Sequence, residues 1–130
     1  MGNLLGIDYG KSKIGIALAP KSLLALKLKV LTNDDNFFKE LARIIQENEV
    51  DKIVVGLPLN MDGTKSKETK EAEEFAEKLQ EKFTKLRVVT YDERLSTVEA
   101  KKNLPGKLPD DTEAARIILQ GYLDKRKKQL

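Results

Sequence analysis

The chain has 130 residues, of which 40% are hydrophobic and 35% are charged, and its formal net charge is +3. This length predicts a single domain over residues 1–130, and the small basic excess permits an anionic partner without requiring one. The sequence contains no cysteine and no histidine, which excludes disulfides, thiolate nucleophiles, histidine general bases and the commonest zinc ligands. Catalysis would therefore depend on carboxylates, lysines, hydroxyls or a bound metal, and Asp and Glu total 21.

The N-terminal part predicts a three-stranded antiparallel meander. Three short segments in which apolar residues dominate or alternate are separated by turns, which is typical of strands. The predicted strands are about Asn3–Asp8, Lys13–Ala19 and Ala25–Leu31. Leucine and valine alternate with lysine in the third, which indicates one solvated face. We expect Gly10, in the first turn, to take the positive φ that a tight hairpin favours.

Helical and strand patterns alternate along the rest of the chain. The predicted elements are a helix from Asn33 or Asp34 to about Asn48, a strand at Lys52–Gly56, a helix from Ser66 to about Phe83, a strand at Leu86–Tyr91, a short helix at Ser96–Asn103, and a last helix that starts within 110–113 and ends near Lys127. A meander followed by such units predicts an α/β fold, with a five-stranded mixed sheet and helices on both faces.

The sequence also limits where the protein works. No signal-peptide pattern precedes the first predicted strand, and no apolar run approaches the roughly 18 residues that span a bilayer. We therefore expect a cytoplasmic protein with no membrane contact.

Acidic residues stand at three predicted element ends: Asp8, the pair Asp92 and Glu93, and the pair Asp110 and Asp111. Asp8 is the most unusual of these residues, because removing a charge from water costs free energy and its strand is otherwise apolar. Loops beyond strand ends converge in open α/β sheets, and carboxylates that meet there repel one another unless a divalent cation neutralises them. Two such ions about 3.5–4 Å apart would activate a water for phosphodiester cleavage. The alternative is structural: Asp110 as a helix cap, Asp111 as a helix-dipole partner, and the other pair as solvated loop acids.

Basic and polar residues near these acids are candidates for holding phosphates. Lys11, Ser12 and Lys13 lie in or next to the first turn, although turn lysines are usually just solvated. Arg94 follows a candidate ligand, and it could clamp a phosphate or pair with Asp92.

Four segments together resemble the YqgF family, also called RuvX or the RuvC-like Holliday junction resolvase family. They are GIDYG with IGIA within Gly6–Ala17, VVGLPLNMDGT at Val54–Thr64, DERLSTVEA at Asp92–Ala100, and DTEAARIILQGYL at Asp111–Leu123. The resemblance covers about the whole chain. It implies a ribonuclease H-like fold and metal-dependent nuclease chemistry on structured nucleic acid, with Mg²⁺ or Mn²⁺, as two ions, as the cofactor.

The resemblance also implies a set of site residues. Asp8, Glu93 and Asp111 take the places of the family's three acids, which makes them the expected catalytic residues and metal ligands. The loop at 101–109 looks shorter than is usual, and the pair Asp110–Asp111 replaces an apolar–Asp step. Which of these two is the ligand, and whether Asp92 contributes, therefore stays open.

Several functions remain compatible with the sequence. The first is a metal-dependent endonuclease that processes the 5′ end of pre-16S rRNA in ribosome biogenesis, and the second is a Holliday junction resolvase acting as a symmetric dimer. The third is a non-catalytic RNA-binding assembly factor. A nucleotide-binding module of the actin and Hsp70 type is disfavoured, because 130 residues cannot supply two domains that close on a nucleotide. The partner is a pre-rRNA or a branched DNA, and the protein is a monomer or a homodimer.

Overall fold

The structure is a computed structural model, which describes residues 2–95 and 110–128. Its strands are β1 (Asn3–Asp8), β2 (Lys13–Ala19), β3 (Leu26–Thr32), β4 (Val50–Leu57) and β5 (Arg87–Asp92). Its helices are α1 (Phe37–Glu47), α2 (Lys67–Lys82) and α4 (Asp111–Lys128), with short 3₁₀ turns at Pro20–Ser22 and Glu93–Leu95. The predicted short helix at 96–103 and the loop after it lie outside the described residues.

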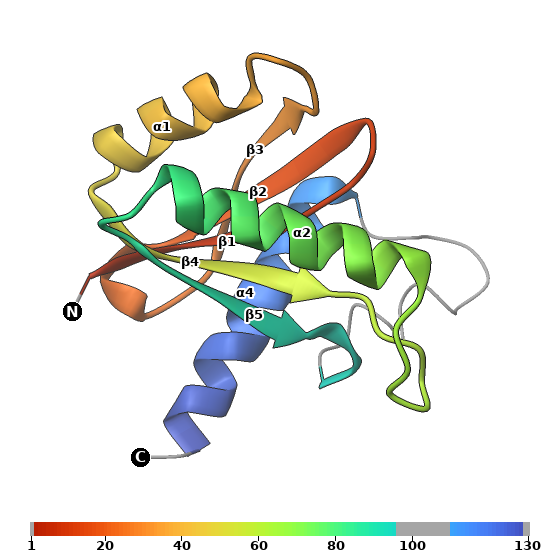
Figure 1. Ribbon diagram of the computed structural model, residues 1–130. Helices are drawn as coiled ribbons and strands as arrows, with labels where there is room; N and C mark the ends of the chain where they lie inside the picture. Colours follow the sequence, from red (N-terminus) through yellow and green to blue (C-terminus); the bar gives the residue numbers. More distant parts are fainter. Residues whose placement is uncertain (1, 96–109, 129–130) are drawn as a thin grey trace.

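The five strands form one mixed sheet in the order β3-β2-β1-β4-β5. The pairs β1–β2 and β2–β3 are antiparallel, whereas β1–β4 and β4–β5 are parallel. The prediction of a meander that continues into parallel strands is therefore confirmed. The carboxyl ends of β1, β4 and β5 consequently point to the same edge of the sheet (Figure 1).

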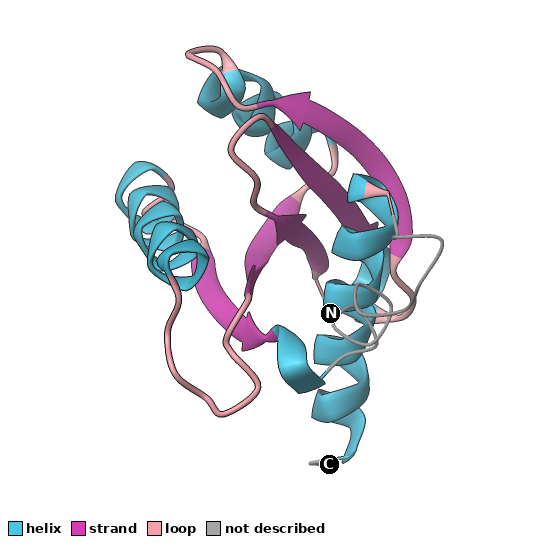
Figure 2. Ribbon diagram, turned by 90° about the vertical axis from the view of Figure 1, so that its right-hand side faces the viewer, coloured by secondary structure: helices cyan, strands magenta, loops and turns pink. Residues whose placement is uncertain are grey.

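Helices cover both faces of the sheet, as predicted, with α1 and α2 on one face and α4 on the other (Figure 2). Successive side chains of a strand point to opposite faces, so each central strand contributes to two cores. The core under α1 and α2 includes Leu5, Ile7, Ile53, Val55, Phe37, Leu41, Phe75 and Leu79. The core under α4 includes Leu4, Ala17, Val54, Ala115, Ile118 and Leu119. Within the described residues no helix is long and apolar enough to cross a membrane.

The helix α2 begins where its sequence predicts. Ser66 is the N-cap, and its hydroxyl accepts a hydrogen bond from the Thr69 amide at 3.2 Å. The Thr69 hydroxyl in return accepts a hydrogen bond from the Ser66 amide at 3.1 Å, which completes a capping box. This start fixes the end of the loop that follows β4.

The prediction of one buried face on β3 is wrong. Leu26, Leu28 and Val30 are 47%, 39% and 38% exposed. β3 is an outer strand, and a register shift opposite Ile16 and Ala17 leaves Leu28 without a paired residue on β2. Leu31, near the end of β3, is buried at 5% exposed, whereas the apolar side chains before it are not, because an outer strand has a neighbour on one side only.

Candidate active site

Asp8 is the last residue of β1 and lies on the face of the sheet that α4 covers. A Cβ added to Gly6 would meet Leu119 Cβ at 2.6 Å and the Ala115 carbonyl oxygen at 3.0 Å, both in α4. Because strand side chains alternate, Asp8, two residues further on, projects to this same face. Asp8 is half-buried. The costly charge in the first strand therefore sits under one end of α4, at the carboxyl edge of the sheet.

Asp111 reaches the same corner through close contact between α4 and β2. Gly15 is the β2 residue paired with Asp8. A Cβ added to Gly15 would lie 2.0 Å from the Asp111 carbonyl oxygen, a distance that no real side chain tolerates. Glycine at this position lets the first turn of α4 rest directly on the sheet, which places Asp111 next to the strand position that pairs with Asp8.

Glu93 approaches from the other side, directly after β5. It is only 1% exposed. A Cβ added to Gly56 of β4 would meet Glu93 Cγ and Ile118 Cγ1 of α4, both at 3.1 Å. The parallel register of β1 and β4 runs up to the pair Ile7 and Val55, so Asp8 and Gly56 follow on neighbouring strands. The buried Glu93 thus lies against the strand next to Asp8.

The three predicted acids therefore lie at one edge and on one face of the sheet, but in the described residues they are not close enough together to hold a metal ion. In residues 2–95 and 110–128, no group of three or more His, Cys, Asp and Glu side chains is close enough to hold a metal ion. The donor chemistry fits Mg²⁺ or Mn²⁺, since both prefer hard carboxylate oxygens. The assignment of Asp8, Glu93 and Asp111 as ligands stays a prediction.

Asp110 has a different role, because it caps α4. Its Oδ1 accepts hydrogen bonds from the Glu113 amide at 2.7 Å and from the Thr112 hydroxyl at 2.8 Å. These two bonds, the amide first, lower the pKa of Asp110 below its usual value. The interpretation of Asp110 as a helix cap is confirmed. Since the carboxylate of Asp110 is engaged with the helix start, Asp111 is the better candidate for a ligand.

Arg94 pairs with Asp92, one of the two alternatives that the sequence left open. Arg94 Nη2 lies 2.7 Å from Asp92 Oδ2, and Nε donates to both carboxylate oxygens at 3.1 Å. These bonds lower the pKa of Asp92. Arg94 Nη1 also donates to the Met61 carbonyl oxygen at 3.1 Å, and the guanidinium lies beside Gly63, whose φ is +89°. Arg94 thereby fastens the loop after β4 to the end of β5.

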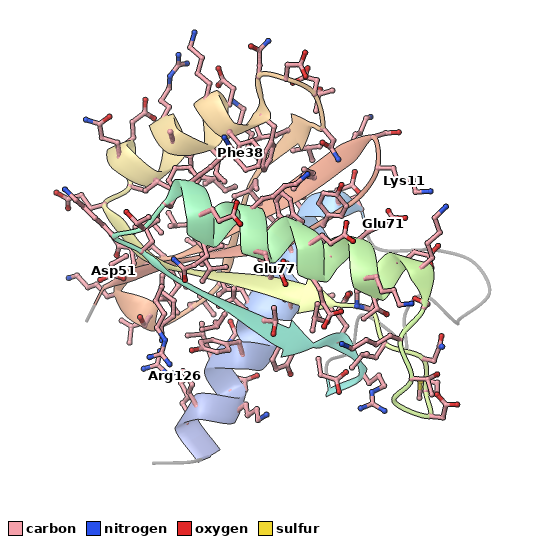
Figure 3. The ribbon with its side chains drawn as sticks, viewed as in Figure 1. Lys11, Phe38, Asp51, Glu71, Glu77 and Arg126 are labelled. Carbon is pink, nitrogen blue, oxygen red and sulfur yellow. The ribbon has the colours of Figure 1, made fainter. Side chains whose placement is uncertain are left out.

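The turn residues Lys11, Ser12 and Lys13 are exposed, close in sequence to Asp8. The Lys11 ammonium lies 3.8 Å from the Glu71 carboxylate of α2 (Figure 3). Asn33 holds this turn, because its side-chain amide donates to the Gly10 carbonyl oxygen at 2.8 Å. Their predicted contact with nucleic acid stays a prediction.

The expected positive φ at Gly10 is wrong, because Gly63 is the one glycine in the described residues with a positive φ. Gly10 is needed for space instead, since a Cβ there would lie 2.5 Å from the Lys13 carbonyl oxygen. Gly6, Gly15 and Gly56 also have packing roles that were not predicted from the sequence. A glycine inside a strand pattern is the signal that could have identified them, because it often marks close approach by another backbone.

This five-stranded mixed sheet, in the order β3-β2-β1-β4-β5 and with helices on both faces, is a ribonuclease H-like fold. Among solved structures, RuvC from Thermus thermophilus in complex with a Holliday junction substrate has a TM-score of 0.63 at 14% identity, covering 98% of this chain and 96% of that chain. A second structure of Thermus thermophilus RuvC has a TM-score of 0.59 at 12% identity. At these identities the likeness shows the fold.

The chain belongs to the RuvX family, described as Holliday junction resolvase, whose model matches residues 2–125. A relative from Ruminiclostridium cellulolyticum named "Putative pre-16S rRNA nuclease" is 39% identical and aligns over 94% of both chains. A relative of the same name from Pseudomonas syringae pv. tomato is 40% identical, covering 98% of this chain and 94% of its own length. The predicted resemblance is confirmed, and the chain is a member of a nuclease family.

Proposed function

We propose that this protein is a metal-dependent endonuclease that processes the 5′ end of pre-16S rRNA. The observation that supports this most is the convergence of Asp8, Glu93 and Asp111 at one edge of the sheet, where Gly15 and Gly56 leave room for two of them. The printed name of the relatives supports the choice of substrate.

The chain's own residues would supply position and negative charge. Glu93 is buried against Gly56 and Ile118, and Asp111 is carried on the first turn of a long helix, so both carboxylates come from well-supported elements. We propose that Asp8, Glu93 and Asp111 hold the divalent ions, Mg²⁺ or Mn²⁺ and two in number. When bound, such ions supply a water of lowered pKa and stabilise the leaving oxygen. A sequence without histidine needs this supply, because no imidazole is present to act as a base.

The test is a cleavage assay with purified protein, a 5′-extended 16S rRNA precursor and a four-way DNA junction, each with Mn²⁺, with Mg²⁺ and with a chelator. We expect cleavage only with metal, and loss of cleavage in Asp8→Asn, Glu93→Gln and Asp111→Asn. The matched control is Asp110→Asn, which keeps a capping side chain and should keep activity. Full activity of Asp8→Asn would overturn the assigned mechanism.

The second candidate is a Holliday junction resolvase, which is favoured by the description of the family. Two strands must be cut at a junction, so this function requires a symmetric dimer. Metal-dependent cleavage of the junction but not of the precursor, together with a dimer in sedimentation experiments, would establish it. If neither substrate is cut but the precursor is bound, the protein is a non-catalytic RNA-binding assembly factor.

A further inference from the structure

A basic hollow lies between β5 and the C-terminal half of α4. It has a volume of about 430 Å³, and four of its lining residues are cationic: Lys52, Arg87, Lys125 and Arg126. We call these four residues and the hollow between them the basic groove. Figure 3 labels Arg126, one of these four residues. The four cations come from β4, β5 and α4, so this concentration of charge is a product of the fold.

Tyr122 holds two of these cations in place. The Lys52 ammonium donates to the Tyr122 hydroxyl at 3.0 Å and lies 5.6 Å from the centre of its ring. The Arg126 guanidinium carbon lies 5.7 Å from the same ring centre. Cations near an aromatic ring are attracted by its quadrupole. Because Lys52 and Arg126 are already ordered, an anion that binds them costs less side-chain entropy.

The acidic side chains nearby leave the groove positive. Asp92 lines it but is paired with Arg94. Asp124 is exposed, and its carboxylate accepts a hydrogen bond from Gln120 at 3.0 Å. Asp51 lies in a neighbouring hollow of about 320 Å³, which shares Lys52 and Arg126 with the groove. One paired and two peripheral acids do not offset four cations.

The position of the groove relative to the candidate active site decides what it binds. Asp92 lines one end of the groove, and the next residue is Glu93. β5 is the outer strand on this side of the sheet, and its exposed Thr90 also lines the groove. Amides, hydroxyls and cations are the groups that contact phosphates in protein–nucleic acid complexes.

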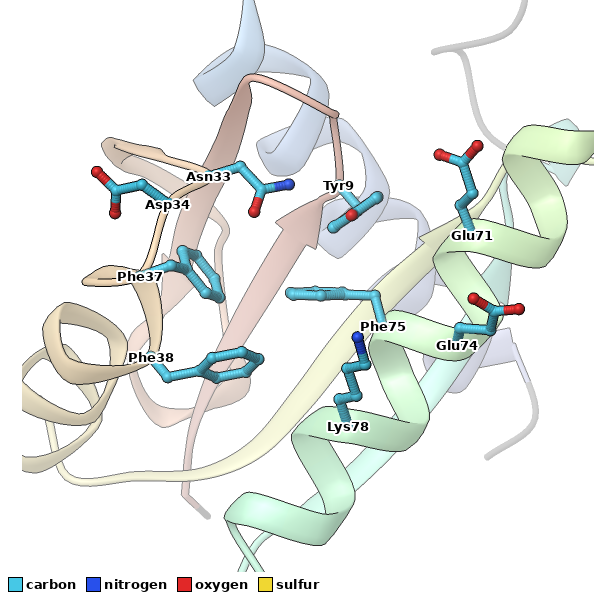
Figure 4. A pocket seen from close by; sticks show the side chains of 9 residues that line it. All are labelled: Tyr9, Asn33, Asp34, Phe37, Phe38, Glu71, Glu74, Phe75 and Lys78. Carbon is cyan, nitrogen blue, oxygen red and sulfur yellow. The ribbon is translucent and has the colours of Figure 1, made fainter.

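A second pocket shows the opposite chemistry. It has a volume of about 130 Å³ and lies on the α1 and α2 face, where Tyr9 and Phe75 are surrounded by Asp34, Glu71 and Glu74 (Figure 4). Three carboxylates and one ammonium, that of Lys78, make this pocket unsuited to a phosphate chain. A nucleic acid backbone is therefore directed to the α4 side of the sheet.

We infer that the basic groove binds the phosphodiester backbone of the substrate strand a few nucleotides away from the scissile bond, since Lys125 lies 14 residues beyond Asp111 on α4, about 21 Å along the helix. This inference rests on the proposed function, because it needs a nucleic acid at Glu93. It assigns Lys52, Arg87, Lys125 and Arg126 as phosphate-binding residues that read no sequence. RNA and DNA share the phosphodiester backbone, so the groove accepts both.

The test measures how tightly the protein carrying Asp8→Asn binds fluorescently labelled nucleic acid. Binding is followed by fluorescence anisotropy at KCl concentrations from about 50 to 200 mM, because affinity that comes from phosphate contacts falls strongly over this range. One arm uses an RNA stem–loop with a single-stranded 5′ extension, and the other uses a four-way DNA junction. The groove variant adds Arg87→Glu and Lys125→Glu, two exposed residues. The matched control adds Lys39→Glu and Lys78→Glu, exposed on α1 and α2, and has the same net charge.

We expect the groove variant to bind about tenfold or more weakly in both arms, and its log Kd against log salt slope to fall by about 1 for each cation. The control should bind like the parent, and both should melt like it. Equal weakening in groove variant and control would overturn the inference, because it would mean that net charge alone matters. Weakening in one arm only would show that the groove reads more than the backbone, which also overturns it.

Failure of the proposed function looks different. If the wild-type protein cuts neither substrate with metal present, the nuclease proposal fails. If the wild-type protein cuts a substrate but the groove variant binds as tightly as its parent, only the inference about the groove fails. If the parent protein carrying Asp8→Asn binds neither nucleic acid, the inference about the groove is also wrong.

Discussion

Replacing Gly15 by alanine tests whether close packing of α4 positions the candidate site. The new Cβ would lie 2.0 Å from the Asp111 carbonyl oxygen, and ordinary contact begins at 3.4 Å, so the first turn of α4 has to retreat by about 1.4 Å. The obstacle is a backbone atom, so no side-chain rotation removes it. Overpacking of this kind costs about 1–3 kcal/mol of unfolding free energy.

The expected result has two parts. The melting temperature of Gly15→Ala should fall by roughly 4–12 °C, taking about 4 °C per kcal/mol for a chain of this size. Nuclease activity, measured where the variant is fully folded, should fall by about 100-fold, since a catalytic group misplaced by about 1 Å has that effect. Differential scanning fluorimetry and the metal-dependent cleavage assay measure the two quantities.

A matched control uses the same substitution further along the same helix. In Gly121→Ala the new Cβ would lie 2.7 Å from the Tyr91 hydroxyl oxygen. Ten residues separate it from Asp111, about 15 Å along a helix. It should change the melting temperature but not the activity of the folded protein. If Gly15→Ala instead keeps both wild-type values, the contact between α4 and β2 does not position Asp111, and the reasoning is refuted.

Two further predictions concern stability. Ser66→Ala removes the acceptor for the Thr69 amide at the start of α2, and we expect the free energy of unfolding, from urea titration, to fall by about 0.5–2 kcal/mol; no change would mean that the capping box is not formed in solution. Asp92→Asn removes the ion pair with Arg94, whose hydrogen bonds lower the pKa of Asp92 from its usual 3.8. Because the pKa of Asp92 is lower in the folded state than in the unfolded state, its ion pair stabilises the fold fully at pH values above the unfolded-state pKa. This stabilisation is lost as the pH falls through the folded-state pKa. The wild type should therefore unfold at a higher temperature than Asp92→Asn near pH 7, and the gap should close below about pH 3.8; a gap that does not depend on pH would contradict the assignment.

Local patterns in the sequence were enough to predict the order of strands and helices. The strands β1 and β2 match the predicted ranges residue for residue, because apolar runs ended by glycine, proline or a charge are local signals. Asp8 also stood out from the sequence, since its charge conflicts with its apolar strand. The family resemblance added Glu93 and Asp111, which residue patterns alone could not separate from ordinary loop and capping acids.

Other features were decided by hydrogen bonds and packing in the folded chain, some of them between near neighbours in sequence. Asp110 became a cap and Arg94 became the partner of Asp92 because of hydrogen bonds that periodicity does not encode. The alternating leucines of β3 looked half-buried in sequence, but burial depends on which strands and helices lie beside a strand, and β3 is at the edge.

The candidate site itself shows the same division. The sequence alone determined which carboxylates were available and that no histidine or cysteine could replace them. Only the tertiary structure brought Asp111 to Gly15 and Glu93 to Gly56, because the missing side chains of these glycines matter only once α4 packs on the sheet. The basic groove, too, exists only after β4, β5 and α4 have come together, since side chains far apart in sequence share a charge surface only through the packing of their elements.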